Sequence, residues 1–381
     1  MNPPIPNSLQ IDSDMLTPLV RRALKQDDVV VFDWKDDALQ GGSFNSKTYR
    51  FSGNAHSGED VLPWSLILKV IRSPDGKDDP ASLNYWKREA LAYQSGLLDN
   101  LPGGTRAPQC FGIVEQPGLE TWLWLEEIAD ETQGNWTLEQ YGIVAHHLGQ
   151  FNGAYIKEQS LLKQLWLASG RLRTWVADAT PAIPVSADVL AHPLVSHLYP
   201  DDIYKRLLRI WSERETWLVF IGNQPQTLAH LDAFRWNLFI CHDRHGQKQI
   251  ILIDWSFVGS AALGEEIAPL VAASLNFLEI SPNNAQALDE IVFASYLEGL
   301  RETGWQGDPR VVRFTYMASA VLRYSIGVIG IASMIADEEK HTLLERIFGH
   351  PLKELVNVWS NTTRFLCDLA DEAGGLLRSL R

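Results

Sequence analysis

Residues 227–240, TLAHLDAFRWNLFI, place three polar side chains, His230, Asp232 and Asn237, among leucine, phenylalanine and tryptophan. Polar groups are costly to bury unless they have hydrogen-bond partners. The three side chains are therefore expected either to satisfy one another or to bind a ligand.

The segment NLFICHDRHGQKQIILID, residues 237–254, predicts a β-hairpin. The turn signal DRHG lies at its centre, where Gly246 tolerates a positive φ. A hairpin closed there sets Asn237 and Asp254 opposite each other at its open end. An amide oxygen and a carboxylate that converge in this way suit Mg²⁺, which prefers oxygen ligands. Asp232 lies in the loop that enters the hairpin, where a base would be needed.

A lysine and a glutamate far upstream form a second expected pair. Lys69 lies within SLILKVI, a predicted strand in which a buried charge needs a partner. Residues 79–98 predict a helix with Asp79 as its N-cap, and Glu89 lies at the edge of its apolar stripe, facing the sheet. The sequence therefore predicts that Lys69 and Glu89 pair.

Composition limits the class of protein. The chain has 381 residues, of which 45% are hydrophobic, and a formal net charge of -14. This charge argues against nucleic acid as a partner, since such proteins present a basic face. The acidity fits either simple solubility or a pocket for a cationic substrate. The 14 tryptophans mostly indicate core packing, and a few could form a wall for a ring-shaped ligand.

Three further features indicate a cytoplasmic protein without a membrane partner. The N-terminus has no signal-peptide pattern, and three widely spaced cysteines fit a reducing compartment. The longest apolar run, residues 324–336, is too short to span a bilayer and predicts a buried helix. The sequence does not indicate an oligomeric state.

The order of predicted elements indicates an α+β, bilobal architecture. Residues 1–128 read as a small β-rich lobe that ends in a hinge at about residues 126–130. Alternating or apolar runs predict its strands at residues 29–34, 47–51 and 64–72, and two more around a Pro-Gly turn within residues 110–128. Residues 129–381 read as a larger, mainly helical lobe containing the predicted hairpin, and Thr137 is expected to cap its first helix. A small lobe over a large one makes a cleft, which is a common place for a ligand.

Several residues with suitable chemistry occur in an order along the chain that resembles a known family, over roughly residues 28–275. The set consists of Lys69, Glu89, His230-x-Asp232-x4-Asn237 and Ile253-Asp254-Trp255. This set resembles the aminoglycoside phosphotransferase and choline-kinase-like family, small-molecule kinases with a protein-kinase-like fold. GGSFNSKTYRF resembles the phosphate loop of that family, and LWLEEI resembles its hinge.

The resemblance implies a nucleotide site and a catalytic loop. It implies that Lys69, oriented by Glu89, holds the α- and β-phosphates of ATP, with GTP as an open alternative. It assigns Ser43 and Asn45 to the phosphates and the backbone of Glu126 and Ile128 to adenine. In the loop, it implies that Asp232 accepts or orients the proton of the attacking hydroxyl, that His230 supports the loop, and that Asn237 and Asp254 bind Mg²⁺.

The chain also departs from the family pattern. Leu231 replaces a glycine that often precedes the catalytic aspartate, and Glu266 stands where the family usually has a supporting aspartate. Arg235 could face the acceptor, the triphosphate or Glu266, and the pair with Glu266 is slightly favoured. These departures leave the acceptor open among aminoglycosides, amino alcohols, sugars and hydroxylated amino acids.

The expected function is an ATP- and Mg²⁺-dependent phosphotransferase that acts on a hydroxyl of a small-molecule acceptor. One alternative is a kinase-like module that binds nucleotide without transferring phosphate. Another is a hydrolase that uses Asp232 and Asp254 with a metal, which would leave Lys69, Glu89 and the hinge unexplained.

Overall fold

The computed structural model describes residues 11–39, 46–82, 84–132, 134–158, 161–243 and 245–381. The chain forms two compact units. The first unit comprises residues 1–101, 106–130 and 251–256, and the second comprises residues 102–105, 131–250 and 257–381. The first unit therefore includes a short segment, residues 251–256, that comes from far along the chain.

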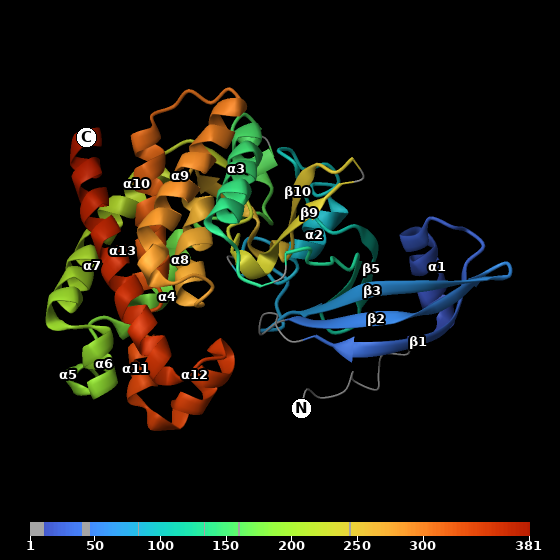
Figure 1. Cartoon of the computed structure of the whole chain (residues 1–381), viewed down its shortest axis with the longest axis horizontal. Helices are drawn as coiled ribbons and strands as arrows, with labels where there is room; N and C mark the ends of the chain where they lie inside the picture. Colours follow the sequence, from blue (N-terminus) through green and yellow to red (C-terminus); the bar gives the residue numbers. More distant parts are fainter. Residues whose placement is uncertain (1–10, 40–45, 83, 133, 159–160, 244) are drawn as a thin grey trace. The chain divides into compact units, whose positions relative to one another are not determined.

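The first unit is built on a five-stranded antiparallel sheet (Figure 1). Its strands, in the order in which they lie, are β1 (Val30–Ala38), β2 (Ser46–Ser57), β3 (Asp60–Arg72), β6 (Glu120–Leu125) and β5 (Cys110–Gln116). Each of these strands had been predicted from alternating or apolar runs. In the register of β2 and β3, Thr48 pairs with Lys69 and Arg50 with Ile67. Because side chains alternate along a strand, Lys69 and Arg50 point to the same face of the sheet.

Helix α1 (Ser13–Leu24) covers the opposite face of this sheet (Figure 1). Asp12 caps the helix, since its carboxylate accepts a hydrogen bond from the backbone N–H of Met15 at 2.9 Å. Leu16 and Val20 of α1 are fully buried in one apolar cluster with Leu66 and Leu68 of β3. The faces of β3 therefore divide cleanly, with an apolar core on one side and Lys69 on the other.

The helix that carries Glu89 is much shorter than predicted. The sequence predicted a helix over residues 79–98, whereas α2 spans only Arg88–Gln94. The Asp79 carboxylate accepts from the N–H of Ala81, the Tyr85 hydroxyl donates to Asp78, and Trp86 Nε1 donates to the carbonyl of Lys77. These local side-chain bonds compete with helical hydrogen bonds and keep the approach to α2 irregular.

The second unit is mainly helical (Figure 1). Its α-helices are α3 (Leu138–Tyr155), α4 (Arg171–Ala179), α5 (Ala187–Ala191), α6 (Pro193–Leu198), α7 (Asp201–Gly222), α8 (Ala268–Asn276), α9 (Ala285–Glu302), α10 (Pro309–Val321), α11 (Ile331–Ala336), α12 (His341–Phe348) and α13 (Leu352–Leu380). Short 3₁₀ segments are η1 (Leu161–Lys163), η2 (Thr180–Ala182), η3 (Arg235–Asn237), η5 (Glu265–Ile267), η6 (Pro282–Asn284) and η8 (Glu338–Lys340), and η4 (Trp255–Phe257) spans the boundary between the units.

Helix α3 begins with the predicted cap at Thr137, which forms a reciprocal capping box with Gln140. It packs closely on α9 through glycine. A Cβ added at Gly149 would overlap the backbone carbonyl of Tyr296, and one added at Gly299 would overlap the carbonyl of His146. The two glycines therefore allow α3 and α9 to pack at close distance.

Two small sheets flank the loop that contains Asp232. Strand β8 (Gln226–Ala229) pairs with β11 (Gly259–Ala262), which also pairs with β7 (Ala168–Ser169). These short strands had not been predicted. The predicted hairpin is confirmed as β9 (Leu238–His242) and β10 (Lys248–Leu252), which form a sheet with β4 (Thr105–Arg106). Gly246 takes φ 75° in the turn between them.

The apolar run at residues 324–336 is not one regular helix. It belongs to a helical stretch, Pro309–Ala336, in which the π-helical turn η7 (Leu322–Ile326) follows α10 and precedes α11. By length and composition alone this longer stretch could cross a membrane, whereas the run at residues 324–336 by itself is too short to do so. Of its most apolar window, 56% is buried against the rest of the chain, as in the core helix of a globular domain.

Candidate active site

In the first unit, Lys69 of β3 lies between two carboxylates. Its Nζ is 2.5 Å from Oε2 of Glu89 on α2 and 3.0 Å from Oδ1 of Asp254. Lys69 and Glu89 are buried, with Glu89 only 2% exposed, whereas the side chain of Asp254 is 23% exposed. The predicted pair of Lys69 and Glu89 is therefore confirmed, and the structure adds Asp254 to it.

The neighbouring charges shift the pKa values of Lys69 and Glu89. Burial alone would lower the pKa of Lys69, but the carboxylates of Asp254 and Glu89 outweigh it and raise this pKa above its usual value. Burial raises the pKa of Glu89, and the ammonium group of Lys69 opposes that rise. Lys69 is therefore held as a cation, which is the form that binds phosphate oxygens.

Residues 251–256, which include Asp254, are anchored within the first unit. Arg88 of α2, which is 1% exposed, donates from Nη1 to the carbonyl of Ser256 at 2.9 Å. Trp255 Nε1 donates to the carbonyl of Leu252 at 2.9 Å. Asp254 itself takes φ 61°, a left-handed conformation that aspartate tolerates better than most residues. The carboxylate of Asp254 is thus directed to Lys69 by a fixed backbone.

In the second unit, the loop with His230, Asp232 and Asn237 is held largely by its own polar groups. His230 is fully buried, and its Nδ1 accepts from the N–H of Asp232 at 3.2 Å. The side-chain amide of Asn237 donates to the carbonyl and to Oδ2 of Asp232, each at 3.0 Å. The three polar residues of the opening stretch therefore do satisfy one another, and the assignment of His230 as a support of the loop stays a prediction.

Glu266 holds the same loop from below. It is 1% exposed and accepts from the backbone N–H of His230 at 2.7 Å and of Leu231 at 3.3 Å. Burial raises its pKa to about 7, an effect that the N–H donors oppose. The supporting role expected at this position is thus filled by a glutamate.

Arg323, from the π-helical turn η7, is a site residue that sequence reasoning missed. Its Nη2 lies 2.6 Å from Oδ1 of Asp232, and its Nη1 donates to the carbonyl of Leu231 at 2.6 Å. The only signal in the sequence was a single arginine at the start of the longest apolar run.

The sequence slightly favoured a pair between Arg235 and Glu266, and this prediction is wrong. Arg235 instead donates to the carbonyls of Leu238, Thr132 and Gly134, and its guanidinium lies 4.6 Å from the ring centre of Trp136. Both oxygens of Glu266 instead accept from backbone N–H groups of the loop that contains Asp232. Arg235 therefore braces the loop backbone.

Aromatic side chains follow Asp232 directly. Phe234 stacks on Phe277 with ring centres 5.6 Å apart, and Trp236 lies 4.7 Å from the same ring. Trp236 is 48% exposed, and its Nε1 donates to the carboxylate of Glu279. The exposed ring of Trp236, packed on Phe277 beside the carboxylate of Glu279, offers a surface suited to a cationic or ring-shaped ligand.

The predicted hinge, residues 126–130, has no regular secondary structure. The Glu126 N–H donates to the carbonyl of Gln109 at 2.9 Å, and its carboxylate binds Arg106. Glu127 pairs with Arg50 of β2 at 2.9 Å.

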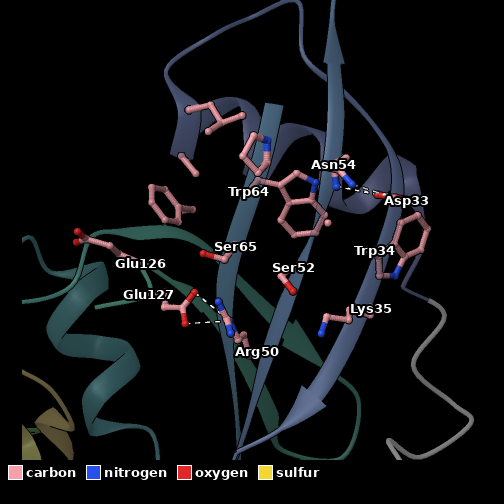
Figure 2. Close-up of a pocket in the computed structure, with 15 residues that line it drawn as sticks. Asp33, Trp34, Lys35, Arg50, Ser52, Asn54, Trp64, Ser65, Glu126 and Glu127 are labelled. Atoms are coloured by element: carbon pink, nitrogen blue, oxygen red, sulfur yellow. Dashed lines mark hydrogen bonds and ion pairs between the residues drawn. The ribbon is translucent and has the colours of Figure 1, made fainter. Parts of the chain in front are cut away.

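Figure 2 shows this pair at the edge of a pocket of about 760 Å³ within the first unit. Ser52, Ser65, Glu126 and Trp64 also line the pocket. Ser43 and Asn45, expected near the phosphates, lie outside the described residues, and the position of Ile128 in a nucleotide site stays a prediction.

The expected Mg²⁺ ligands provide suitable oxygen atoms. The amide nitrogen of Asn237 is turned to Asp232, which leaves its oxygen as the atom for a cation. Asp254 supplies a carboxylate in the other unit, so the pairing of the two as ligands stays a prediction. Among the described residues there is no group of three or more His, Cys, Asp and Glu side chains suited to a metal.

Comparison with known proteins identifies the fold. No protein-family model matches the chain, and no curated protein sequence matches it. Among solved structures, a microcompartment-associated aminopropanol kinase is similar, with a TM-score of 0.53, 14% identity and coverage of 93% of this chain and 98% of that one. The GDP complex of aminoglycoside 2'-phosphotransferase-IIIa is similar with a TM-score of 0.50, 11% identity and coverage of 93% and 99%.

These likenesses confirm the expected fold class. The chain has the protein-kinase-like fold of small-molecule kinases, with a β-sheet unit followed by a mainly helical unit. At such low identity the likeness concerns the fold, so function must be argued from the side chains of the site.

Proposed function

We propose that the chain is an ATP- and Mg²⁺-dependent phosphotransferase that moves the γ-phosphate to a hydroxyl of a small molecule. The observation that carries this proposal is the position of Lys69 between Glu89 and Asp254, at 2.5 and 3.0 Å. A lysine held charged by a helix glutamate beside a potential metal ligand is the nucleotide-binding arrangement of kinases. A structural ion pair alone would not need the second carboxylate.

In this proposal each unit supplies one part of the chemistry. Lys69 binds the α- and β-phosphates, and the backbone of Glu126 and Ile128 reads the base. Asn237 and Asp254 would hold Mg²⁺, which supplies charge neutralisation at the phosphates when bound. Ser43 and Asn45 are assigned to the phosphates on the sequence pattern alone.

Asp232 orients the acceptor hydroxyl and takes its proton. The hydroxyl oxygen forms a bond to the γ-phosphorus as the bond from phosphorus to the ADP oxygen breaks. A carboxylate has about four lone-pair sites. One site on Oδ1 receives Arg323 and one on Oδ2 receives Asn237, so acceptor sites remain for the hydroxyl.

The acceptor class is proposed as aminoglycoside, amino alcohol or sugar. The rings of Phe234 and Trp236 beside Glu279 favour a cationic or cyclic acceptor. The aminopropanol kinase and the aminoglycoside phosphotransferase with a similar fold motivate both classes, and the GDP complex of the latter keeps GTP open as a donor. The proposal includes a cytoplasmic location, with neither nucleic acid nor membrane as partner.

The test is an acceptor screen that reports ADP release, with parallel measurement of nucleotide binding. We expect turnover with at least one amino alcohol, aminoglycoside or sugar. Asp232→Asn should remove most of that turnover, leaving a small residual ADP release, while ATP binding persists, and Asp254→Asn should weaken Mg-ATP binding. Full activity in Asp232→Asn, or unchanged Mg-ATP affinity in Asp254→Asn, would contradict the assigned roles.

A second candidate is a nucleotide-binding module that no longer transfers phosphate. It is motivated by the ion pair between Asp232 and Arg323, which occupies part of the proposed base. Mg-dependent ADP release in the presence of any acceptor, or of water alone, would exclude it.

A further inference from the structure

Arg323 lies in an unusual place for a charged residue. It belongs to the π-helical turn η7 (Leu322–Ile326), within the long apolar helical stretch Pro309–Ala336. Its side chain is 13% exposed. Burying a guanidinium is costly unless it is fully paired, and π-helical turns are rare and frequent at functional sites. The position therefore calls for an explanation beyond surface charge.

The guanidinium of Arg323 is fixed by contacts in two directions. Its carbon lies 3.6 Å from the ring centre of Trp175 on α4 and 4.9 Å from that of Tyr324. Its two terminal nitrogens reach the carbonyl of Leu231 and the carboxylate of Asp232, both at 2.6 Å. The planar, rigid fork of an arginine suits such a double contact, whereas a lysine can make only one of the two well.

The backbone that these contacts hold is strained. Leu231 takes φ 66°, in the left-handed region that costs a non-glycine residue about 1–2 kcal/mol. On one side, Glu266 accepts the N–H groups of His230 and Leu231. On the other side, Arg323 binds the Leu231 carbonyl. The loop thus lies between the carboxylate of Glu266, which accepts from its N–H groups, and the guanidinium of Arg323, which donates to its carbonyl.

We propose that Arg323 is a positioning residue for Asp232. It holds the Leu231 peptide and one carboxylate oxygen of Asp232 in place, so that the rest of this carboxylate is presented to the acceptor hydroxyl. This inference rests on the proposed phosphotransferase function. It explains in one way why the arginine is buried, why it lies in a π-helical turn, and why Leu231 keeps a left-handed conformation.

The test compares Arg323→Met and Arg323→Lys with a matched control, Arg173→Met. Arg173 lies near the same region on α4 but is exposed and pairs with Glu215. A displacement of a reacting group by about 1 Å costs on the order of 100-fold in rate. We expect Arg323→Met to lower kcat by about this factor, with ATP affinity changed less than about twofold. Arg323→Lys should recover part of the loss, and Arg173→Met should behave as wild type.

A double-mutant cycle separates positioning from a merely structural role. If Arg323 acts through Asp232, adding Arg323→Met to Asp232→Asn should cause little further loss of the residual ADP release. Multiplicative losses, or a fall in thermal stability with unchanged kcat, would overturn the inference. If Arg323→Met does not fold, Arg323→Gln is used in its place.

Two other outcomes are distinguishable. An increase of kcat in Arg323→Met would show that the ion pair restrains Asp232, which contradicts the inference while keeping the phosphotransferase. If the wild-type chain releases no ADP, whether an acceptor is added or only water is present, the proposed function is wrong. This inference, which rests on that function, is then wrong as well.

Discussion

At the scale of single residues, Lys69 shows how strongly one buried charge depends on its partners. Removing one member of a buried ion pair typically costs about 3–5 kcal/mol, because an uncompensated charge remains. Lys69→Met should therefore destabilise the chain by about this amount, since it leaves Glu89 and Asp254 facing each other. Denaturant unfolding measures the change.

The control for Lys69 is the double variant Lys69→Met/Glu89→Leu. This variant removes the buried carboxylate that the single variant leaves unpaired, so it should recover much of the lost stability. A single variant as stable as wild type would mean that the ion pair contributes little to folding. Nucleotide binding should be lost in both variants, because neither retains the cation for the phosphates.

Glu266 predicts a pH dependence of stability. Burial raises its pKa from 4.5 to about 7 in the folded chain, so the folded state binds its proton more tightly than the unfolded state does. The stability from this group is therefore complete below pH 4.5 and is lost as the pH rises toward 7. Glu265 has the same shift and direction.

The corresponding experiment measures unfolding free energies of wild type and Glu266→Gln at pH 5 and pH 7.5. Glu266→Gln should lose less stability across this interval than wild type, while Glu265 maintains part of the dependence in both. An identical pH dependence would show that Glu266 does not titrate there. The variant should also lower turnover, since the two loop N–H groups bind different oxygens of Glu266 and the amide nitrogen of glutamine cannot accept a hydrogen bond.

The contrast between Lys69 and Arg323 shows which site residues a sequence can predict. Lys69 stands out because a charge in an apolar strand needs a partner, and Glu89 lies at a suitable helical position nearby in the chain. Arg323 lies 91 positions from Asp232, and no local pattern indicates which loop a residue of an apolar helix will meet. Glu266 was predicted to support the loop because of its resemblance to a family pattern.

At the scale of elements, periodicity predicted the strands of the first sheet and the hairpin β9–β10 well. It failed where side chains compete with backbone hydrogen bonds, as in the irregular approach to α2. It also missed the short strands β7, β8 and β11, because two to four residues carry too little alternation to be distinguished from a loop. The π-helical turn η7 has no sequence signature of its own.

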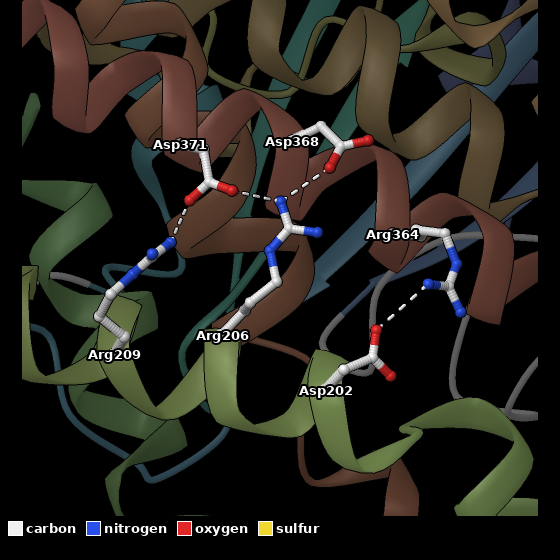
Figure 3. A network of polar contacts seen from close by, with 6 residues as sticks. All are labelled: Asp202, Arg206, Arg209, Arg364, Asp368 and Asp371. Atoms are coloured by element: carbon white, nitrogen blue, oxygen red, sulfur yellow. Dashed lines mark hydrogen bonds and ion pairs between the residues drawn. The ribbon is translucent and has the colours of Figure 1, made fainter.

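The contacts of α13 offer a test of exposed against buried ion pairs. Figure 3 shows Asp371 of α13 facing Arg206 and Arg209 of α7, with Arg364 and Asp202 nearby in the same network. Asp371 is 46% exposed, so Asp371→Ala should cost less than about 1 kcal/mol.

Asp289 of α9 is instead buried and accepts from Arg313 and from the Tyr316 hydroxyl. Asp289→Ala should cost about 3–5 kcal/mol in urea unfolding, and equal costs for the two variants would contradict this reading.

At the scale of the whole molecule, the net charge of -14 bears on how an acceptor arrives. A strongly acidic protein attracts cations over distances comparable to the Debye length, about 8 Å at physiological ionic strength, and added salt screens this attraction. If the acceptor is a cationic amino alcohol or aminoglycoside, kcat/KM should fall as salt rises from about 0.05 to 0.5 M. The matched control is a neutral sugar found to be an acceptor in the same screen, for which kcat/KM should change little. Glu279→Gln removes the carboxylate beside Trp236 and should reduce the salt dependence for the cationic acceptor only, because it removes a local part of the attraction. Equal salt dependence for charged and neutral acceptors would mean that the acidity serves solubility, and that selection of the acceptor depends on the aromatic rings and hydrogen bonds around Asp232.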